Sequence, residues 1–570
     1  MKLYLIAYGT VLLVASVFAR KQTWVEAVGQ TINLDVAVYG ATPGGVASAV
    51  AALQTGYAPR NYTVGLINPT GHVGGMVAGG LGHTDIGNSS VIGGIAAHFF
   101  REVCNGTQNI GTGPCHFFAP SAAEAAFDRM LSQASDGRLT QLKRYRVVSA
   151  TMEQLNYASI ARHRPSYGAD GLRATVQHSA RAASPASTGP AIKCIQLVQQ
   201  TGVLSDPSGI ARDEGAALRD GTVLQVCARV FIDATYEGDL AAVAGADLAF
   251  GREASSQHNE SMAGMLSSSL EVEYGNPINQ FRKAINGTGP QGELLPLLYG
   301  GPLSPAGAAD NHTMAYNYRM CLARKSAGKS LPLPMPPGGY DPADWELLRR
   351  YIASIGPSDA GELSSYMNVQ WLLPTAPDKS DVNNHGPITT DFSQGSWEYP
   401  PFNWTRRREI IRNHIDYTAG LMHFLAEDPA VPPSVHGSMA ALGLPSDEFQ
   451  DATETGIQGW PYQLYVREAN RLIGQYVFLQ MDRSDPSRFR KNTVIGLAAY
   501  NIDVHHGVRY YRQPEMERRI GGGAQGVTSE GAGDTATAPL VWNEGNFDRW
   551  HELGPTDIPY EVLVPRDDGL

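Results

Sequence analysis

The sequence predicts an α/β fold that opens with a strand, a glycine-rich turn, a helix and a second strand. Residues 36–39 form a short apolar run that ends at Gly40, and a helical run of small residues continues to Leu53. A second apolar run, YTVGLIN, ends at Asn68. This order of elements is typical of a Rossmann-like, dinucleotide-binding β-α-β unit. An ordinary β-turn-α with glycines for packing is the alternative for this stretch taken alone.

The glycine turn has the residue types that a bound pyrophosphate requires. Gly40 permits the tight turn, while Gly44 and Gly45 let the backbone approach a ligand closely. The free N–H groups of the following helix would face the phosphates. Two positions depart from the usual pattern. Thr42 stands where the strict GxGxxG motif has its middle glycine, and Asn68 stands where an acidic residue often holds the ribose.

A second glycine-rich segment, GHVGGMVAGGLGHTD, occupies residues 71–85. Repeated glycines suit close approach to a flat or phosphorylated ligand, and a surface loop is the plainer alternative. His83 and Asp85 lie at the end of this segment. Each is more often a hydrogen-bonded structural residue than a catalyst.

A third motif, ARVFIDATYEGDLAAVAGADLAFGRE, occupies residues 228–253. Its apolar strand ends at Asp233, a tight turn follows, and a helix of small residues is expected to begin at Asp239. The motif therefore repeats the order of strand, turn and closely packed helix.

Composition and charge narrow the class of protein. The chain has 570 residues, a formal net charge of −11 and no basic block. It is long enough for a large core and more than one domain, and nucleic acid is not an expected partner.

The N-terminus predicts export. Lys2 precedes an apolar run over residues 3–18, and Val17 and Ala19 occupy the small-residue positions before a cleavage site. This pattern is typical of a signal peptide over residues 1–19, with an uncleaved anchor as the alternative. Seven N-x-S/T triplets support a secreted glycoprotein: Asn61, Asn88, Asn105, Asn259, Asn286, Asn311 and Asn403.

The five cysteines indicate disulfides rather than a metal site. Cys104 and Cys115 bracket a short loop, and Cys194 and Cys227 lie in two strand-like runs that could be neighbours. No CxxC or Cys/His spacing suggests zinc, so no metal is expected.

The remaining periodicity predicts helices at residues 93–103, 121–133, 344–355 and 406–425. Residues 461–481 are also interpreted as helical, with Arg467 interleaved among apolar side chains. Residues 158–190, rich in Arg, Ser and Ala, are interpreted as an insertion. Near the end of the chain, AAYNIDVHH places His505 after an apolar run.

The three motifs, taken together, resemble the FAD-dependent oxidoreductase family, some members of which carry the label xanthan lyase. Later segments extend the resemblance: NNHGPITTDF, PYQLYVREANRLIGQY, AAYNIDVHH and IPYEVLVP. The resemblance implies a three-layer FAD/NAD(P)-binding fold of the glutathione-reductase type, interleaved with a mixed α+β substrate or cap domain. It covers most of residues 35–565.

The resemblance also implies how the chain is divided. Residues 35–103 and 191–253 would form a discontinuous FAD-binding domain, and 104–190 with 254–570 the substrate or cap region. The cofactor-binding residues it implies are Gly40, Thr42, Gly44, Gly45, Asn68, Gly74, Gly75, Met76, Asp233, Ala234, Thr235, Glu237, Gly238 and Asp239. Family members continue past this motif into a Ser-His- and Gly-rich stretch and a helix facing the flavin, so a C-terminal part is expected to be missing after Leu570.

The resulting hypothesis is a secreted FAD-dependent oxidoreductase. It would oxidise a small organic or carbohydrate substrate by hydride transfer to the flavin, with molecular oxygen as the expected electron acceptor. His83, Asp85, His505 and Arg467 are the candidate substrate-side residues. A catalytically impaired, flavoprotein-like binding or structural protein is the alternative.

Overall fold

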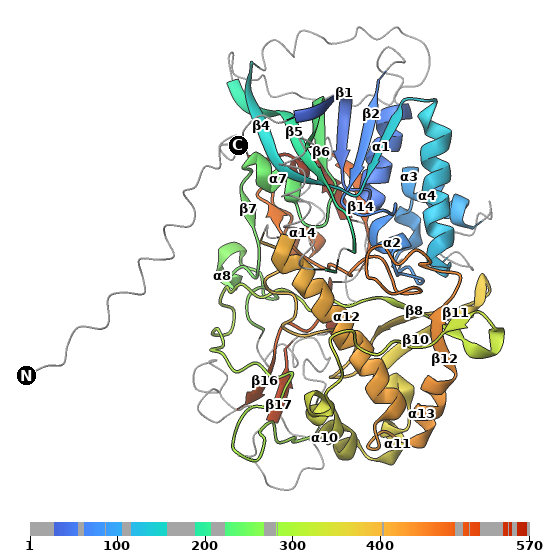
Figure 1. Ribbon diagram of the computed structural model, residues 1–570. Coiled ribbons are helices and arrows are strands. Elements are labelled where there is room, and N and C mark those ends of the chain that lie inside the picture. Colours follow the sequence, from blue (N-terminus) through green and yellow to red (C-terminus); the bar gives the residue numbers. More distant parts are fainter. Residues whose placement is uncertain are drawn as a thin grey trace, which may run out of the picture.

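The molecule is built around a six-stranded sheet with the strand order β3-β2-β1-β6-β5-β4 (Figure 1). The computed structural model describes residues 28–54, 62–85, 87–104, 116–156, 188–203, 205–206, 223–266, 281, 283–401, 404–484, 494–500, 502–512, 540–544, 547–549 and 556–566. The six strands are β1 (Val28–Tyr39), β2 (Val64–Asn68), β3 (Leu139–Lys143), β4 (Tyr145–Asn156), β5 (Thr188–Gln199) and β6 (Val223–Asp233). β1 lies parallel to β2 and β6, whereas β5 runs antiparallel to β4 and β6.

Both faces of this sheet are covered, because successive side chains of β1 point to opposite sides. Val38 packs with α1 (Pro43–Gln54), α3 (Gly94–Val103) and α4 (Pro120–Ser135), which lie on one side of the sheet in Figure 1. Tyr39 joins a separate cluster with Leu240 of α7 (Asp239–Ala244). These layers give the three-layer α/β fold that the sequence predicts.

The structure corrects one predicted domain boundary. Residues 104–190 were assigned to the cap region, yet α4, β3, β4 and the start of β5 belong to the six-stranded sheet and its helical layer. The physical reason is edge pairing. β3 extends the sheet beside β2, and β4 pairs with β5 along its length. Much of the predicted insertion, residues 157–187, lies outside the described residues.

The second region contains a five-stranded sheet with the order β10-β11-β8-β12-β9. Its strands are β8 (Met320–Arg324), β9 (Ser330–Leu331), β10 (Met367–Leu372), β11 (Ala376–Asn384) and β12 (Leu442–Pro445). Its helices are α10 (Glu346–Ile355), α11 (Pro357–Ala360), α12 (Trp404–Glu427) and α13 (Pro433–Ala440). The predicted helices at 344–355 and 406–425 are therefore confirmed, as are those at 93–103 and 121–133.

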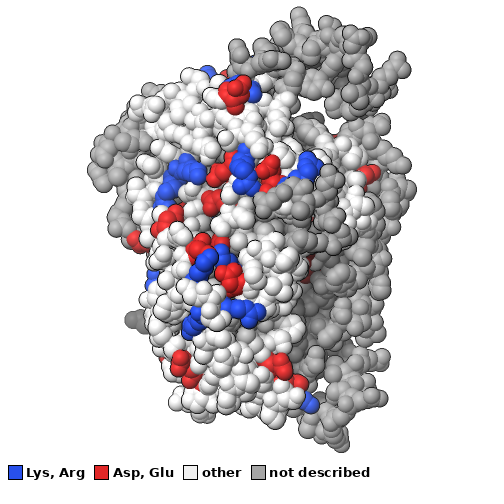
Figure 2. Space-filling view, turned by 90° about the vertical axis from the view of Figure 1, so that its right-hand side faces the viewer, with Lys and Arg blue, Asp and Glu red and all other residues white. Residues whose placement is uncertain are grey.

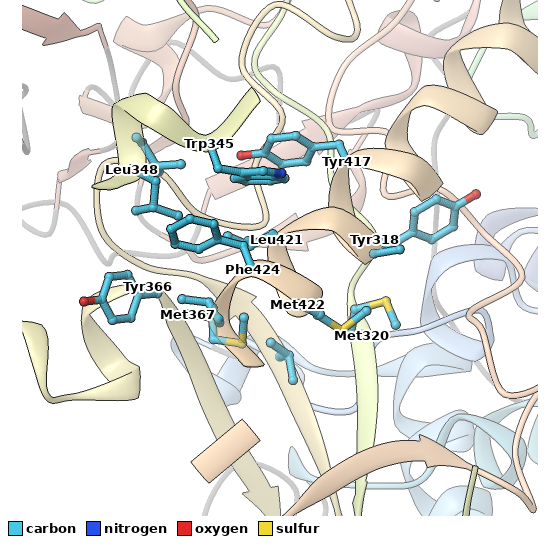
Figure 3. Packing of buried hydrophobic residues seen from close by; sticks show 14 of the residues in the cluster. Tyr318, Met320, Trp345, Leu348, Tyr366, Met367, Tyr417, Leu421, Met422 and Phe424 are labelled. Atoms are coloured by element: carbon cyan, nitrogen blue, oxygen red, sulfur yellow. The ribbon is translucent and has the colours of Figure 1, made fainter. Parts of the chain in front are cut away.

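The core of this second region lies between α10, α12 and the five-stranded sheet. Trp345 packs against Tyr417 and Phe424 of α12, and Met422 of the same helix lies near Met320 of β8 (Figure 3). Burial of these apolar side chains is the main favourable contribution to folding here.

Residues 461–481 do not form the predicted helix, and this prediction was wrong. The segment is mostly irregular, with only β13 (Arg471–Leu472) and the start of α14 (Gln480–Ser484). Its backbone N–H groups are used in pairing with distant segments: Gln463 donates to Gly79, and Tyr465 donates to Asn317. Tertiary pairing has overridden the local helical spacing.

Short elements complete the fold. They are α2 (Gly75–Ala78), β7 (Leu248–Ala249), α8 (Ser255–His258), β14 (Val494–Ala498), β15 (Ile502–Val504), β16 (Arg509–Arg512), β17 (Leu540–Asn543), β18 (Phe547–Arg549) and β19 (Thr556–Pro559). Within the described ranges, no helix has the length and apolarity that crossing a membrane requires. On the face drawn in Figure 2, basic and acidic side chains are interspersed among uncharged residues.

Candidate functional site

A cavity lies beside the carboxyl ends of β1, β2 and β6, with about 680 Å³ of empty space that includes its opening to solvent. Open α/β sheets bind ligands at this edge. The lining residues are Gly40, Thr42, Asn68, Pro69, Thr70, Gly75, Thr235, Tyr236, Glu237, Tyr318, Tyr399, Trp404, Ile411, Glu454, Tyr462, Gln463 and Leu464. The cavity therefore brings together all three glycine-containing motifs and the second region.

The glycine turn fits a dinucleotide on steric grounds. Gly40 has a φ of +103°, and a Cβ there would lie 2.7 Å from the Ala234 backbone. A Cβ at Gly45 would lie 1.8 Å from the Gly40 carbonyl oxygen. At Gly44, by contrast, the nearest atom would be Thr42 Oγ1 at 3.7 Å. Gly40 and Gly45 are thus required by the turn itself, and Gly44 leaves open space at the start of α1, where phosphate can approach.

Thr42 replaces the middle glycine without closing the turn. Its hydroxyl donates to the Ala234 carbonyl at 2.6 Å and accepts from the Gly45 N–H at 3.3 Å. The side chain therefore ties the end of β6 to the start of α1.

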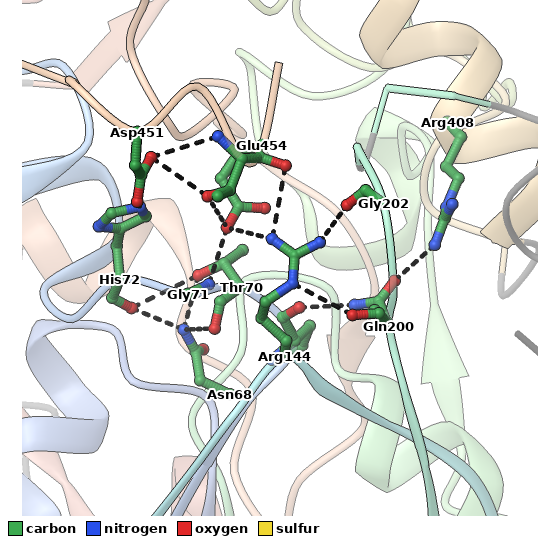
Figure 4. A network of polar contacts seen from close by, with 12 residues as sticks. Asn68, Thr70, Gly71, His72, Arg144, Gln200, Gly202, Arg408, Asp451 and Glu454 are labelled. Atoms are coloured by element: carbon green, nitrogen blue, oxygen red, sulfur yellow. Dashed lines mark hydrogen bonds and ion pairs between the residues drawn. The ribbon is translucent and has the colours of Figure 1, made fainter. Parts of the chain in front are cut away.

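The Asn68 side chain uses its hydrogen bonds within the protein, mostly with the loop that follows β2 (Figure 4). Its Oδ1 accepts from the Ala41 N–H at 2.9 Å. Its Nδ2 donates to Thr70 Oγ1 at 2.6 Å and to the His72 carbonyl at 2.7 Å. Asn68 lines the cavity, but its amide hydrogen-bonds both to the turn after β1 and to the loop after β2, and so connects them.

The second glycine segment packs against the turn. The Gly74 N–H donates to the Ala41 carbonyl at 2.7 Å, and Met76 N–H donates to Tyr236 Oη at 2.8 Å. Gly75 has a φ of +51°, and a Cβ there would lie 2.3 Å from the same hydroxyl. Gly74 to Met76 are therefore held against the end of β6, next to the cavity.

Some residues at the end of β6 line the cavity, and others make hydrogen bonds that hold the turn in place. Thr235 and Glu237 line the cavity, whereas Asp233 accepts from the Thr235 hydroxyl at 2.6 Å and from the Ala241 N–H at 2.9 Å. Ala234 and Gly238, with a φ of +71° at Gly238, shape the turn between them. Asp239 is buried and pairs with Arg407.

Two of the four predicted substrate-side residues meet at one buried carboxylate. Arg467 Nη2 lies 3.0 Å from Asp391 Oδ1, and His505 Nδ1 lies 2.9 Å from Asp391 Oδ2. His505 Nε2 lies 3.2 Å from Asp503 Oδ2. Although burial favours the neutral acid, Arg467 and His505 hold the pKa of Asp391 far below its usual value. Burial and Arg467 oppose the charged imidazolium, but the two carboxylates raise the pKa of His505.

His83 and Asp85 are placed elsewhere. The His83 ring stacks on Phe117 with ring centroids 4.4 Å apart. Asp85 is exposed and acts electrostatically on Arg319, which itself bonds to Asp381. The guanidiniums of Arg319 and Arg467 lie 5.8 and 5.3 Å from the Tyr465 ring centroid, so this ring connects the two groups.

Sequence reasoning missed the cavity residues that come from the second region. Glu454 and Tyr462 follow β12, and Tyr318 lies two residues before the start of β8. Burial raises the pKa of the Glu454 carboxyl, while Arg144 lowers it. Burial and Glu454 raise the pKa of the Tyr318 phenol. These positions belong to no dinucleotide motif, so only the tertiary fold identifies them.

Comparison with solved structures gives weak likenesses. The THI4 protein of Thermovibrio ammonificans is 14% identical, with 44% of this chain and 73% of that chain covered and a TM-score of 0.23. The myxobacterial chondrochloren halogenase CndH is 13% identical, with 39% of this chain and 41% of that chain covered and a TM-score of 0.22. The glycerol-3-phosphate dehydrogenase of Bacillus halodurans, solved with FAD, is 9% identical, with 38% of this chain and 37% of that chain covered and a TM-score of 0.19. No curated protein matches the chain.

The family comparison covers most of the sequence. The profile of the family described as FAD dependent oxidoreductase matches residues 35–176 and 199–569. The matched residues include the glycine turn, the second glycine segment and the end of β6. The steric fit of the turn agrees with this assignment, and the cofactor is FAD. The chain belongs to the FAD dependent oxidoreductase family.

Proposed function

We propose that the protein is a secreted oxidoreductase that oxidises a small organic or carbohydrate substrate by hydride transfer to FAD. The observation that carries the proposal is the position of His505 between Asp391 and Asp503, with Arg467 on the far side of Asp391. Oxidation of a hydroxyl-bearing carbon releases one hydride and one proton. FAD supplies the acceptor for the hydride when it is bound. The proton requires a positioned base.

His505 is the group suited to this proton. Above its raised pKa the imidazole is neutral, and it would then accept the proton at Nε2, the nitrogen that otherwise contacts Asp503, while Asp391 at Nδ1 would stabilise the resulting imidazolium. Arg467 keeps Asp391 ionised and orients it, so it acts as a positioning residue.

The glycine motifs would hold the cofactor. Gly44 and the first N–H groups of α1 suit the pyrophosphate, because this side of the turn is open. The Gly74–Gly75 backbone and the Thr235 and Glu237 side chains would lie along the rest of the FAD molecule, beyond its pyrophosphate. The cavity between the two regions would exclude water from part of the bound FAD.

A substrate panel tests the proposal. The chain without its first 19 residues would be loaded with FAD and mixed without oxygen with alcohols, sugars and hydroxy acids. We expect flavin absorbance to bleach with one substrate class, and His505→Gln to slow this step at least tenfold, since general bases contribute about 10²–10⁴-fold. A protein that holds FAD and bleaches with no member of the panel would instead support a binding or structural role.

Secretion is part of the proposal and rests on three observations. The N-terminal pattern is typical of a signal peptide. Cys194 and Cys227 form a disulfide between β5 and β6, as expected for an oxidising compartment. Three of the predicted glycosylation sites, Asn259, Asn286 and Asn311, are exposed.

Expression in a secreting eukaryotic cell tests this part. We expect the protein in the medium, with a mature N-terminus near residue 20 and a mass that falls on enzymatic removal of N-glycans. Retention of residues 1–19 in a cytosolic, unglycosylated product would contradict it. The Cys104–Cys115 pairing stays a prediction, because Cys115 lies outside the described residues.

A further inference from the structure

The ribose-binding position of this fold carries no acid in this chain. Dinucleotide folds often place Asp or Glu at the end of the second strand to accept from ribose hydroxyls. Here that position is Asn68, whose Oδ1 accepts from Ala41 and whose Nδ2 donates to Thr70 and His72. An amide occupied in this way is a poor substitute for a free carboxylate. A carboxylate that lines the same cavity comes from elsewhere in the chain.

Glu454 supplies that carboxylate from the second region. Its Oε1 accepts from the Gly71 N–H at 2.8 Å and from Arg144 Nη1 at 3.2 Å. The residue is only 1% exposed and lines the cavity together with Asn68 and Thr70. Figure 4 shows Glu454, Gly71, Arg144 and Asn68 in one network. The carboxylate is therefore fixed in place by one of its two oxygens.

The other oxygen of Glu454 has no partner. Oε2 is buried and makes no hydrogen bond to any residue that the structure describes. A buried polar atom left unpaired costs about 1–3 kcal/mol, so such atoms are normally satisfied. Gly71 and Arg144 both donate to Oε1, which favours the ionised form; in that form Oε2 only accepts hydrogen bonds, so its partner would be a donor. The vicinal hydroxyls of a ribose are donors of this kind.

We propose that Glu454 Oε2 accepts a hydrogen bond from a ribose hydroxyl in the adenosine half of FAD, replacing the acid that Asn68 lacks. The placement fits, because the cavity joins Glu454 to Gly40 and Thr42 of the glycine turn, where the pyrophosphate is expected. Arg144 donates to the Gln200 and Gly202 carbonyls as well, so its guanidinium is a fixed support for Glu454. The proposal rests on FAD binding and not on the identity of the substrate.

The test compares FAD with analogues whose adenosine ribose lacks the 2′- or the 3′-hydroxyl. Affinities for the apoprotein of the full chain would be measured from flavin fluorescence for wild type, Glu454→Gln, Glu454→Met and a control, Glu448→Gln. Glu448 is also 1% exposed and also accepts from a backbone N–H, that of Ser121, but it does not line the cavity. Thermal unfolding of each variant checks the fold.

We expect wild type and Glu448→Gln to bind FAD roughly ten- to a hundredfold more tightly than one of the two analogues, as hydrogen bonds to charged groups predict. Glu454→Met should bind FAD and that analogue equally, and Glu454→Gln should show a reduced ratio even if the methionine variant does not fold. Equal affinities in wild type, or an undiminished ratio in the Glu454 variants, would overturn the proposal. Catalytic inactivity would not affect these binding ratios, so a failure of the proposed function is distinguishable.

Discussion

Arg407 of α12 holds Asp239 of α7 through one guanidinium nitrogen, with distances of 2.7 and 2.8 Å to the two carboxylate oxygens. Both side chains are buried, and Arg407 also donates to the Tyr399 and Pro400 carbonyls. This pair connects the helix after β6 to the long helix of the second region. It fixes how the two regions meet beside the cavity.

Removal of Arg407 should therefore destabilise the whole protein. Arg407→Ala leaves Asp239 buried and unpaired, which costs about 3–5 kcal/mol. Urea unfolding should show this loss in the free energy of unfolding. Arg406→Ala is the matched control, because Arg406 forms ion pairs at the surface with Glu398 and Glu409. Its loss should be below about 1 kcal/mol, and equal losses in the two variants would contradict the role of the buried pair.

The two adjacent glycines at the start of α1, Gly44 and Gly45, should respond differently to one added methyl group. Gly45→Ala places a Cβ 1.8 Å from the Gly40 carbonyl oxygen, so it should unfold the turn and lower the melting temperature. Gly44→Ala meets no protein atom closer than 3.7 Å and should keep the wild-type melting temperature. Its methyl group would occupy the space that phosphate requires, so FAD affinity should fall roughly tenfold or more, about 1.4 kcal/mol. Unchanged affinity in Gly44→Ala would place the pyrophosphate elsewhere.

This contrast shows what the sequence can and cannot predict. The β-α-β unit was predictable because strand, turn and helix are local: Gly40 is required by its φ of +103°, and Gly45 by its contact with the Gly40 carbonyl oxygen. The helix proposed over residues 461–481 was wrong because its N–H groups pair with Gly79 and Asn317, far away in the chain. Glu454 was missed for the same reason, since its position in the cavity depends on Gly71 and Arg144.

Only part of the proposed catalytic cluster was predicted from the sequence. Arg467 and His505 were both named, but their common partner, Asp391, was not. His83 and Asp85 lie beside Phe117 and Arg319 instead. Spacing along the chain does not report which side chains share a buried carboxylate.

The His505 cluster should make stability depend on pH. The pKa of His505 is raised in the folded state, above the ordinary value of 6.5. The stabilisation from its charged form is therefore complete below pH 6.5 and is lost as the pH rises through the folded-state pKa. The difference in free energy of unfolding between wild type and His505→Gln should shrink across this window. A difference that grows with pH would contradict the cluster, and urea unfolding at a series of pH values decides.

The disulfide between Cys194 and Cys227 should contribute to stability. The two residues are 33 positions apart and join β5 to β6. Cross-links of this kind typically contribute about 2–4 kcal/mol. Replacing both cysteines by alanine should lower the free energy of unfolding by this amount, as measured in urea. Cys321→Ala changes a buried free thiol and serves as the control, because it removes no cross-link. Insensitivity of wild type to reductant would argue against the cross-link.

If the cavity beside the glycine turn holds FAD, the visible spectrum of the purified protein will show the flavin. We predict a flavin absorption spectrum and release of one FAD per chain on denaturation, with less FAD retained by Gly44→Ala than by wild type. A colourless, folded protein that cannot be loaded with FAD would show that this cavity does not hold the cofactor.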